Sequence, residues 1–201
     1  MAIWSITQYA GLDPARFFPE QREIYLRHLM IVAAHTLSSP IALLLGPLQF
    51  HAGLRARLPR LHRACGITYL GAVFLGGLSA IPLTSIAYGY WTTRVGFALL
   101  AVLWLGTAAM ALSCAVRRDY VTHRRWAIRN FSLTLAAVTL RLWVAGLTSL
   151  TETDFDLAYA AAAWCSWVPN LAVAEWLLQD ESRSQRNTPL PKSPINPTMI
   201  R

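Results

Sequence analysis

The chain has 201 residues, of which 55% are hydrophobic and only 14% are charged. A soluble domain of this size carries roughly 25% charged residues. The deficit is concentrated in residues 29–54, 64–93 and 95–116, which contain no Asp, Glu, Lys or Arg. Because about 20 consecutive apolar residues suffice to cross the hydrocarbon core of a bilayer, this composition argues against a soluble protein. It predicts an integral membrane protein.

The formal net charge is +8, and its placement bears on the binding partners. The basic residues form short clusters between the apolar runs, where lipid headgroups lie. We therefore expect the lipid bilayer, and not a nucleic acid, as the partner. The three cysteines, Cys65, Cys114 and Cys165, each lie inside an apolar run and have no zinc-type spacing. We interpret them as small packing residues and expect neither a disulfide framework nor a metal site built from them.

The apolar runs predict five transmembrane helices. These helices cover approximately residues 29–49, 64–84, 95–116, 127–150 and 157–178. The expected fold class is therefore an all-α, polytopic transmembrane helix bundle of about five spans. Residues 1–28 form a polar and amphipathic lead-in, whose aromatic side chains suit a membrane interface. Residues 179–201 are polar and proline-rich, and we expect them to form a disordered cytoplasmic tail.

The distribution of arginine between the loops predicts the orientation of the helices. Loops 51–63 and 117–125 contain four arginines each, whereas loops 85–94 and 151–156 together contain one. Short cytoplasmic loops carry the excess of Lys and Arg in membrane proteins. We therefore expect the two basic loops and the carboxyl terminus to be cytoplasmic and the amino end to be outside.

Two ionisable residues fall inside the predicted spans near the outer side. At 1.5 Å of rise per residue, His35 lies roughly 9 Å and Arg141 roughly 13 Å from that side. Their similar depth indicates that the two side chains can line one outward-facing pocket. Arg141 is either a structural strut to carboxylates or carbonyls, or it binds an anionic group of a ligand.

A second polar cluster is expected at the cytoplasmic side, and it contains Gln49, His51, His62, His123, Arg129 and Glu175. Arg129 lies near the inner start of the fourth span, and Glu175 lies near the inner end of the fifth. Pairing these opposite charges would reduce the cost of placing each of them in the membrane. Arg129 is therefore also a candidate strut or anion ligand.

Three interpretations of the histidines stay open. The first treats them as interfacial residues that hydrogen-bond to loop carbonyls and headgroups. The second treats His35, His62 and His123 as metal or haem ligands, with haem b as the candidate cofactor, because neutral imidazole is a common ligand of Zn, Cu and Fe. The third treats His62, His123 and Glu175 as catalytic acid/base groups in an intramembrane reaction.

The tryptophans allow two interpretations as well. They are suited to packing and to interface anchoring, and they are also able to line a cavity for a hydrophobic small molecule such as a quinone or an isoprenoid. The tryptophans concerned are Trp104, Trp143, Trp164, Trp167 and Trp176.

Five segments of the chain resemble the DUF2306 family of polytopic membrane proteins. In chain order they read HTLSSPIALLLGPLQF (35–50), LRARLPRLHRACGITYL (54–70), VGFALLAVLWLGTAAMA (95–111), YVTHRRWAIRNFSLTLAAVTLRLW (120–143) and WCSWVPNLAVAEWLL (164–178). The resemblance implies a helical membrane fold rather than a particular activity. It also marks out His35, Gln49, Arg55, Pro59, His62, Arg63, Gly66, Tyr69, His123, Arg124, Trp126, Arg129, Arg141, Asn170 and Glu175.

Three functional hypotheses from different classes follow. The first is a small redox or haem-associated membrane protein, with His35, His62 and His123 as ligand candidates. The second is an intramembrane enzyme that acts on a lipid or isoprenoid-like substrate, with His62, His123 and Glu175 as acid/base candidates. The third is a non-catalytic transporter subunit or assembly factor, in which the polar residues are struts and interhelical hydrogen bonds.

Overall fold

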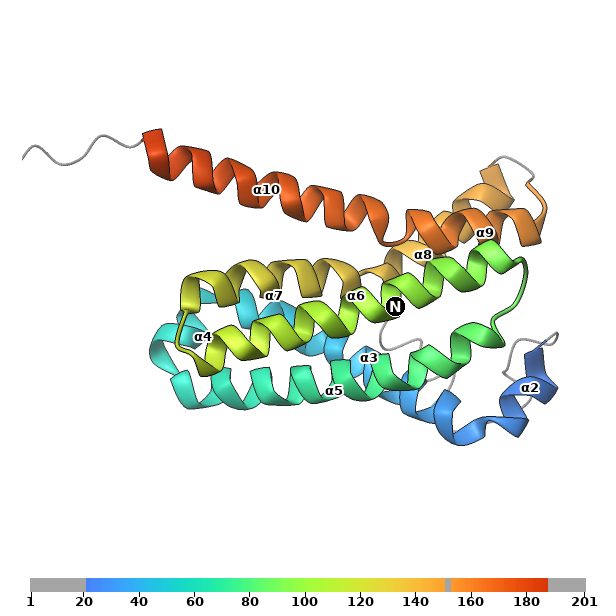
Figure 1. Cartoon of the computed structure of the whole chain (residues 1–201), viewed down its shortest axis with the longest axis horizontal. Helices are drawn as coiled ribbons and strands as arrows, with labels where there is room; N and C mark the ends of the chain where they lie inside the picture. Colours follow the sequence, from blue (N-terminus) through green and yellow to red (C-terminus); the bar gives the residue numbers. More distant parts are fainter. Residues whose placement is uncertain (1–20, 151–152, 188–201) are drawn as a thin grey trace, which may run out of the picture.

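The computed structural model describes residues 21–150 and 153–187, and the regular structure in these ranges is helical throughout. Figure 1 shows the helices and the short turns that join them. In chain order the helices are α2 (Arg22–Arg27), α3 (Leu29–Phe50), α4 (Ala52–Arg57), α5 (Pro59–Ser85), α6 (Trp91–Val116), α7 (Tyr120–Thr134), α8 (Ala136–Leu150), α9 (Phe155–Cys165) and α10 (Val168–Asn187).

Five helical stretches of the described residues are long and apolar enough to cross a membrane. They are Leu29–Phe50, Pro59–Ser85, Trp91–Val116, Tyr120–Leu150 and Phe155–Glu181. The prediction of an all-α, multi-pass membrane protein with about five spans is therefore confirmed. The fourth stretch consists of α7 followed by α8, and the fifth consists of α9 followed by α10.

Several helices extend beyond the apolar runs from which they were predicted. α5 begins at Pro59, because proline favours the first helical position. α7 begins after Asp119, whose carboxylate accepts a hydrogen bond from the Thr122 N–H at 3.1 Å. Hydrogen bonds from the hydroxyl and the backbone N–H of Thr122 hold the pKa of Asp119 below its usual value.

The two ends of the chain were predicted as a lead-in and a tail. Residues 1–20 of the lead-in lie outside the described residues, and Arg22–Arg27 form α2. A disordered tail from residue 179 does not hold for residues 179–187, because α10 continues to Asn187. This polar stretch stays helical where Glu181 pairs with Arg124 of α7. Residues 188–201 lie outside the described residues.

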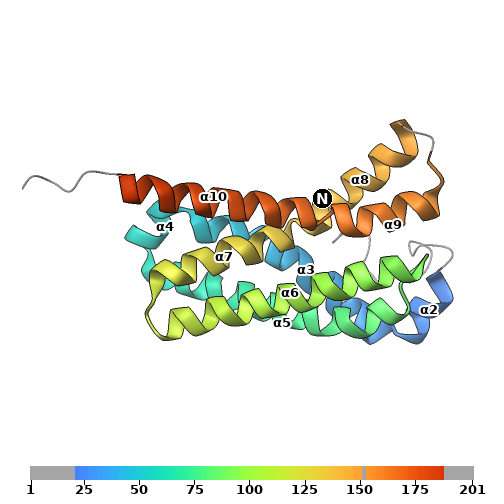
Figure 2. The same cartoon turned by 45° about the horizontal axis from the view of Figure 1, so that its top comes forward.

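Four long helices, α3, α5, α6 and α7, lie side by side along the bundle (Figure 1). α3 packs along α5, α5 along α6 and α6 along α7, while α10 packs against α7. α8 contacts mainly α9, and Figure 2 shows α8 turning away from the line of α7, while α9 packs against both α8 and α6. We call the end that holds α4 and the α6–α7 turn the arginine-rich end. The end that holds α2 and the α8–α9 connection is the opposite end (Figure 2).

Small side chains fill much of the space between these helices. Gly46 lets the ring of Phe131 lie against α3, because an added Cβ would overlap that ring. Without a hydrophobic driving force between helices in lipid, such close backbone approach is a main source of packing energy. By contrast, Leu75, Leu78 and Val102 are more than half exposed, as side chains in contact with lipid would be. The buried core consists of Ala42, Tyr69, Ala72, Val73, Trp104, Ala108, Leu133, Ala136 and Trp167.

A buried polar network joins α5, α6 and α7 near the middle of the bundle. The Tyr69 hydroxyl donates to Asn130 Oδ1 at 2.6 Å and lies 3.0 Å from the Thr134 hydroxyl. Asn130 is fully buried, and its Nδ2 donates to the Trp104 carbonyl at 2.7 Å and to the Thr107 hydroxyl at 2.8 Å. Each of these interhelical bonds satisfies a group that hydrocarbon cannot solvate, so the network fixes how the three helices face one another.

The fourth and fifth spans are both interrupted near their middle. The fourth breaks at Leu135, between α7 and α8, and the fifth breaks at Ser166 and Trp167, between α9 and α10. Pro169 explains the second break, because proline has no N–H and fits only the first turn of a helix. The two breaks contact each other, because the hydroxyl of Thr139 on α8 donates to the Ser166 carbonyl at 2.5 Å.

Candidate functional site

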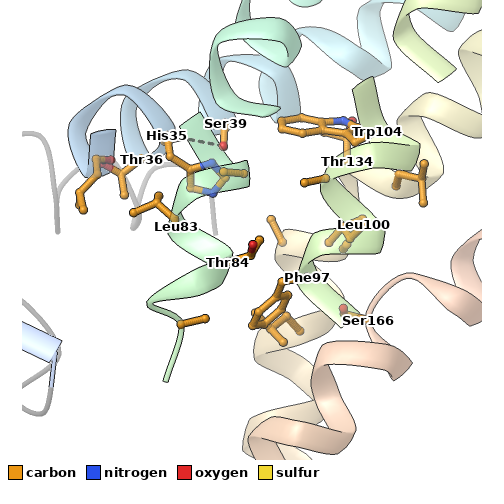
Figure 3. Close-up of a pocket in the computed structure, with 18 of the residues that line it drawn as sticks. His35, Thr36, Ser39, Leu83, Thr84, Phe97, Leu100, Trp104, Thr134 and Ser166 are labelled. Carbon is orange, nitrogen blue, oxygen red and sulfur yellow. Dashed lines mark hydrogen bonds between the residues drawn. The ribbon is translucent and has the colours of Figure 1, made fainter. Parts of the chain in front are cut away.

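A cavity of about 350 Å³ lies between α3, α5, α6, α8 and α9 in the described part of the bundle. Figure 3 shows His35 and Thr36 on one side of this space and Trp104, Leu100 and Phe97 across from them. The cavity lies next to the breaks of both interrupted spans, since Thr134, Ala136 and Ser166 also line it. Irregular backbone at membrane depth is tolerated where it is buried in protein or lines such a cavity.

His35 is held in one orientation on the wall of the cavity. Its Nδ1 lies 2.8 Å from the carbonyl oxygen of Gly76 on α5. A carbonyl only accepts, so Nδ1 carries the proton and donates it. The other ring nitrogen, Nε2, has no hydrogen-bond partner among the described residues and belongs to a side chain that lines the cavity. In the neutral imidazole this nitrogen offers a lone pair.

Arg141 of α8 lines the same cavity as His35, as their similar depth in the sequence suggests. Its guanidinium donates through Nη1 to the carbonyl of Ala137, one turn earlier on the same helix. Tyr159 of α9 also lines this space, so the α8–α9 hairpin brings both a cationic and a phenolic side chain to it. A charged side chain this far inside a span is costly in lipid and is favoured where it faces a polar cavity.

Apolar and aromatic side chains form most of the remaining wall. Phe97 and Tyr159 make an edge-on contact with ring centroids 5.7 Å apart, and Tyr88 lies 6.3 Å from Tyr159. At the deep end the Trp104 indole N–H donates to the Thr134 hydroxyl at 2.9 Å, so this tryptophan is both wall and network member. The cavity is therefore apolar along its sides and polar at a few fixed points, as small-molecule sites usually are.

Two ion pairs at the arginine-rich end join neighbouring helices. Arg129 donates to Glu175 through two nitrogens, at 2.5 Å and 2.8 Å, and its guanidinium lies 4.7 Å from the centroid of the Trp126 ring. Arg124 makes the same kind of bidentate contact with Glu181, with hydrogen bonds of 2.6 Å and 2.8 Å. Both pairs join α7 to α10, so they act as struts between these helices.

The histidines at the arginine-rich end have separate surroundings. His123 Nδ1 donates to the carbonyl of Ala111 on α6 at 2.8 Å. His51 caps α4, because its Nδ1 accepts a hydrogen bond from the Leu54 N–H at 3.0 Å. His62 lies within electrostatic range of His123, and its buried Nδ1 has no hydrogen-bond partner among the residues that the structure describes.

The structure brings some of the candidate residues together and keeps others apart. His35 shares a cavity with Arg141, and Glu175 pairs with Arg129. His35 is far from His62: it contacts Gly76, which is fourteen residues along α5 from His62, or roughly 21 Å at the helical rise. In the part of the chain that the structure describes, no group of three or more His, Cys, Asp or Glu is placed to hold a metal ion.

Some residues of the site were not singled out from the sequence. Thr134 and Tyr159 line the cavity, and Asn130 anchors the network behind it. The sequence could have indicated Asn130, because an amide in the middle of a span must find hydrogen-bond partners inside the protein. The sequence did not indicate that Tyr159 lines a cavity, since an aromatic residue near the end of a span is also expected at the membrane interface.

The helices and the cavity define the class of this molecule: it is a multi-pass, α-helical integral membrane protein. Residues 32–178 match the family described as "Predicted membrane protein (DUF2306)". The chain belongs to this family, and the resemblance inferred from its motifs is confirmed. Neither a curated protein nor a solved structure matches the chain.

We expect the two ion pairs, Arg129–Glu175 and Arg124–Glu181, to differ in how much each stabilises the folded protein. We expect a double-mutant cycle of Arg129→Gln and Glu175→Gln to give a coupling of about 1 kcal/mol in the free energy of unfolding, since the Arg129 side chain is only 20% exposed. The cycle of Arg124→Gln and Glu181→Gln serves as the matched control. Its side chains are 48% and 45% exposed, so its coupling should stay below about 0.5 kcal/mol. Unfolding in detergent micelles measures both, and a larger coupling for the second pair would contradict this ranking.

Proposed function

We propose that this protein binds one small hydrophobic molecule, with a polar group at one end, in the cavity between α3, α5, α6, α8 and α9. One observation carries the proposal: His35 and Arg141 come from different helices to one otherwise largely apolar cavity. A volume of about 350 Å³ lies within the range of about 300–1,000 Å³ that is usual for small-molecule sites. The apolar walls would hold the body of the ligand, and His35 and Arg141 would contact its polar group.

The placement of the other polar residues supports this choice of site. Glu175 is paired with Arg129, so its carboxylate is already used within the protein. As an acid/base group it would first have to leave that pair. His35 is the better acid/base candidate for a reaction on a bound lipid-like molecule, because it lines the cavity. If the protein is an enzyme, this argument favours His35 over His62, His123 and Glu175.

Haem b is a second candidate for the ligand of the cavity. His35 has the arrangement usual in metal-binding histidines, with one nitrogen donating to a carbonyl and the other directed away from it. A single axial histidine suffices in several haem proteins. A bis-histidine site that pairs His35 with His62 has no support, because roughly 21 Å of helix separates them.

A bulky side chain in the cavity should abolish ligand binding. Ala80 of α5 lines the cavity, and Ala80→Phe would fill part of the space. We expect the amount of hydrophobic small molecule that co-purifies with the protein to fall about fivefold or more, because overpacking costs about 1–3 kcal/mol and each 1.4 kcal/mol is a tenfold change in affinity. Mass spectrometry of organic extracts measures it. Leu75→Phe on the same helix is the control, since Leu75 is 54% exposed. Equal extracts from both variants would contradict the proposal.

The haem alternative makes its own prediction. Bound haem would give the detergent-purified protein a Soret band and sharp bands after dithionite reduction. His35→Ala should then lose these bands, whereas His123→Ala should keep them, because His123 lies at the arginine-rich end. A colourless, metal-free protein from haem-replete cells would rule out haem and leave the lipid-like ligand.

We further propose that the arginine-rich end and the carboxyl terminus face the cytoplasm, so that the cavity lies in the outer half of the bilayer. The arginine count of the loops supports this orientation. In a variant with Cys65, Cys114 and Cys165 replaced by alanine, we expect Asp154→Cys to react with a membrane-impermeant maleimide in intact cells. Arg57→Cys should react only after lysis. The reverse pattern would overturn the orientation.

A further inference from the structure

The α3 wall of the cavity presents hydrogen-bond acceptors. The Thr36 hydroxyl donates to the Val32 carbonyl at 2.8 Å, and the Ser39 hydroxyl donates to the His35 carbonyl at 2.7 Å. When each hydroxyl donates its one proton to its own helix, its oxygen keeps lone pairs for a partner in the cavity. Pro40 has no N–H, and the Thr36 carbonyl therefore lacks its usual helical donor.

The α5 side of the cavity has the same character. The Thr84 hydroxyl donates to the Ile81 carbonyl of its own helix at 2.7 Å, which leaves its lone pairs available. The Gly76 carbonyl of α5 accepts the hydrogen bond from the Nδ1–H of His35, which leaves Nε2 as an acceptor in the neutral ring. Four side chains on this wall thus offer acceptors toward one space.

A ligand that matches this wall must bring a hydrogen-bond donor. A ketone, an ether or an ester brings no donor for Nε2 of His35, so this nitrogen would stay unpaired. A cationic amine would bring a donor, but the positive charge of Arg141 on the same cavity disfavours it at low dielectric. A neutral hydroxyl group satisfies both conditions.

We infer that the hydrophobic molecule bound in this cavity carries a hydroxyl group, which donates its hydrogen bond to Nε2 of His35. This inference rests on the proposed function and narrows the ligand to hydrophobic alcohols and phenols. It also gives His35 a specific role, since the residue would select the hydroxyl form of a ligand over an otherwise identical form without the O–H.

Matched pairs of probes that differ only at the O–H test the inference. We would measure equilibrium binding of farnesol and of geraniol, each beside its methyl ether, to the purified protein in lipid nanodiscs at pH 8. We expect each alcohol to bind roughly three- to tenfold tighter than its ether, which is the usual net effect of one hydrogen bond. The ether keeps the chain and the oxygen, so the difference isolates the donated proton.

Two substitutions at His35 separate its two nitrogens. In His35→Asn the amide can still donate to the Gly76 carbonyl, but it does not extend to the position of Nε2. In His35→Gln the longer amide reaches that position and can offer an oxygen. We expect His35→Asn to lose the preference for the alcohol and His35→Gln to keep it. His123→Asn is the matched control, because His123 makes the same Nδ1 contact with a carbonyl, that of Ala111, at the arginine-rich end.

The outcomes distinguish the inference from the proposed function. If wild-type protein binds alcohol and ether equally, the inference is overturned and the cavity proposal stands. If His35→Asn keeps the preference while its thermal unfolding is unchanged, His35 is not the acceptor, and the inference is overturned as well. If wild-type protein binds neither alcohol nor ether, the proposed function fails together with the inference.

Discussion

The hydrocarbon core of a bilayer offers no hydrogen-bond partners, so each polar group inside a span must be satisfied by the protein or by something that the protein encloses. The two interrupted helices show how this chain meets the constraint. Their breaks face each other, and the Asn170 side chain donates to the carbonyls of Ser166 at 2.8 Å and Ser132 at 3.2 Å. Thr139 supplies a further donor to Ser166. The carbonyl at the break in the fifth span is therefore satisfied by Thr139 of the fourth span and by Asn170 of its own span, and the bundle can tolerate irregular backbone beside a cavity.

The same constraint separates the polar residues into two groups. In the first group the protein itself supplies the partner, as in the Arg129–Glu175 pair and the contact of Tyr69 with Asn130. Such groups hold helices together and are explained without any ligand. In the second group a side chain lines the cavity and keeps a lone pair that can accept a further hydrogen bond, as His35 does at Nε2. A group of the second kind is costly unless a molecule or water completes it, which is why the functional proposal is built on His35 and not on the more numerous charges at the arginine-rich end.

The depth of a residue within a span can be predicted from the sequence, because it depends only on the helical rise. Depth follows from counting residues, so His35 and Arg141 could be placed at one level before any helix was positioned. Rotation about the helix axis and neighbour order do not follow from counting. For that reason His62 and His123 looked equivalent, although only His123 donates to a neighbouring helix. The break at Leu135 also had no sequence signal, because no proline or glycine lies there. Its position depends on Thr139 and Ser166 meeting in space, which is a tertiary contact.

The break at Leu135 also explains how Arg141 comes to the cavity. α8 leaves the line of α7 at this point and contacts mainly α9 (Figure 2). α7 packs against α6. If the fourth span were one straight helix, the residues after Leu135 would continue to pack against α6. The change of direction opens space between α8 and the pair α3–α5, and it places the α8–α9 hairpin as the far wall of that space. The break at Leu135 thus accounts both for the cavity and for the position of Arg141 on its wall. The hydrogen bonds between the two interrupted spans satisfy backbone groups that lipid cannot, which allows a ligand site at this depth.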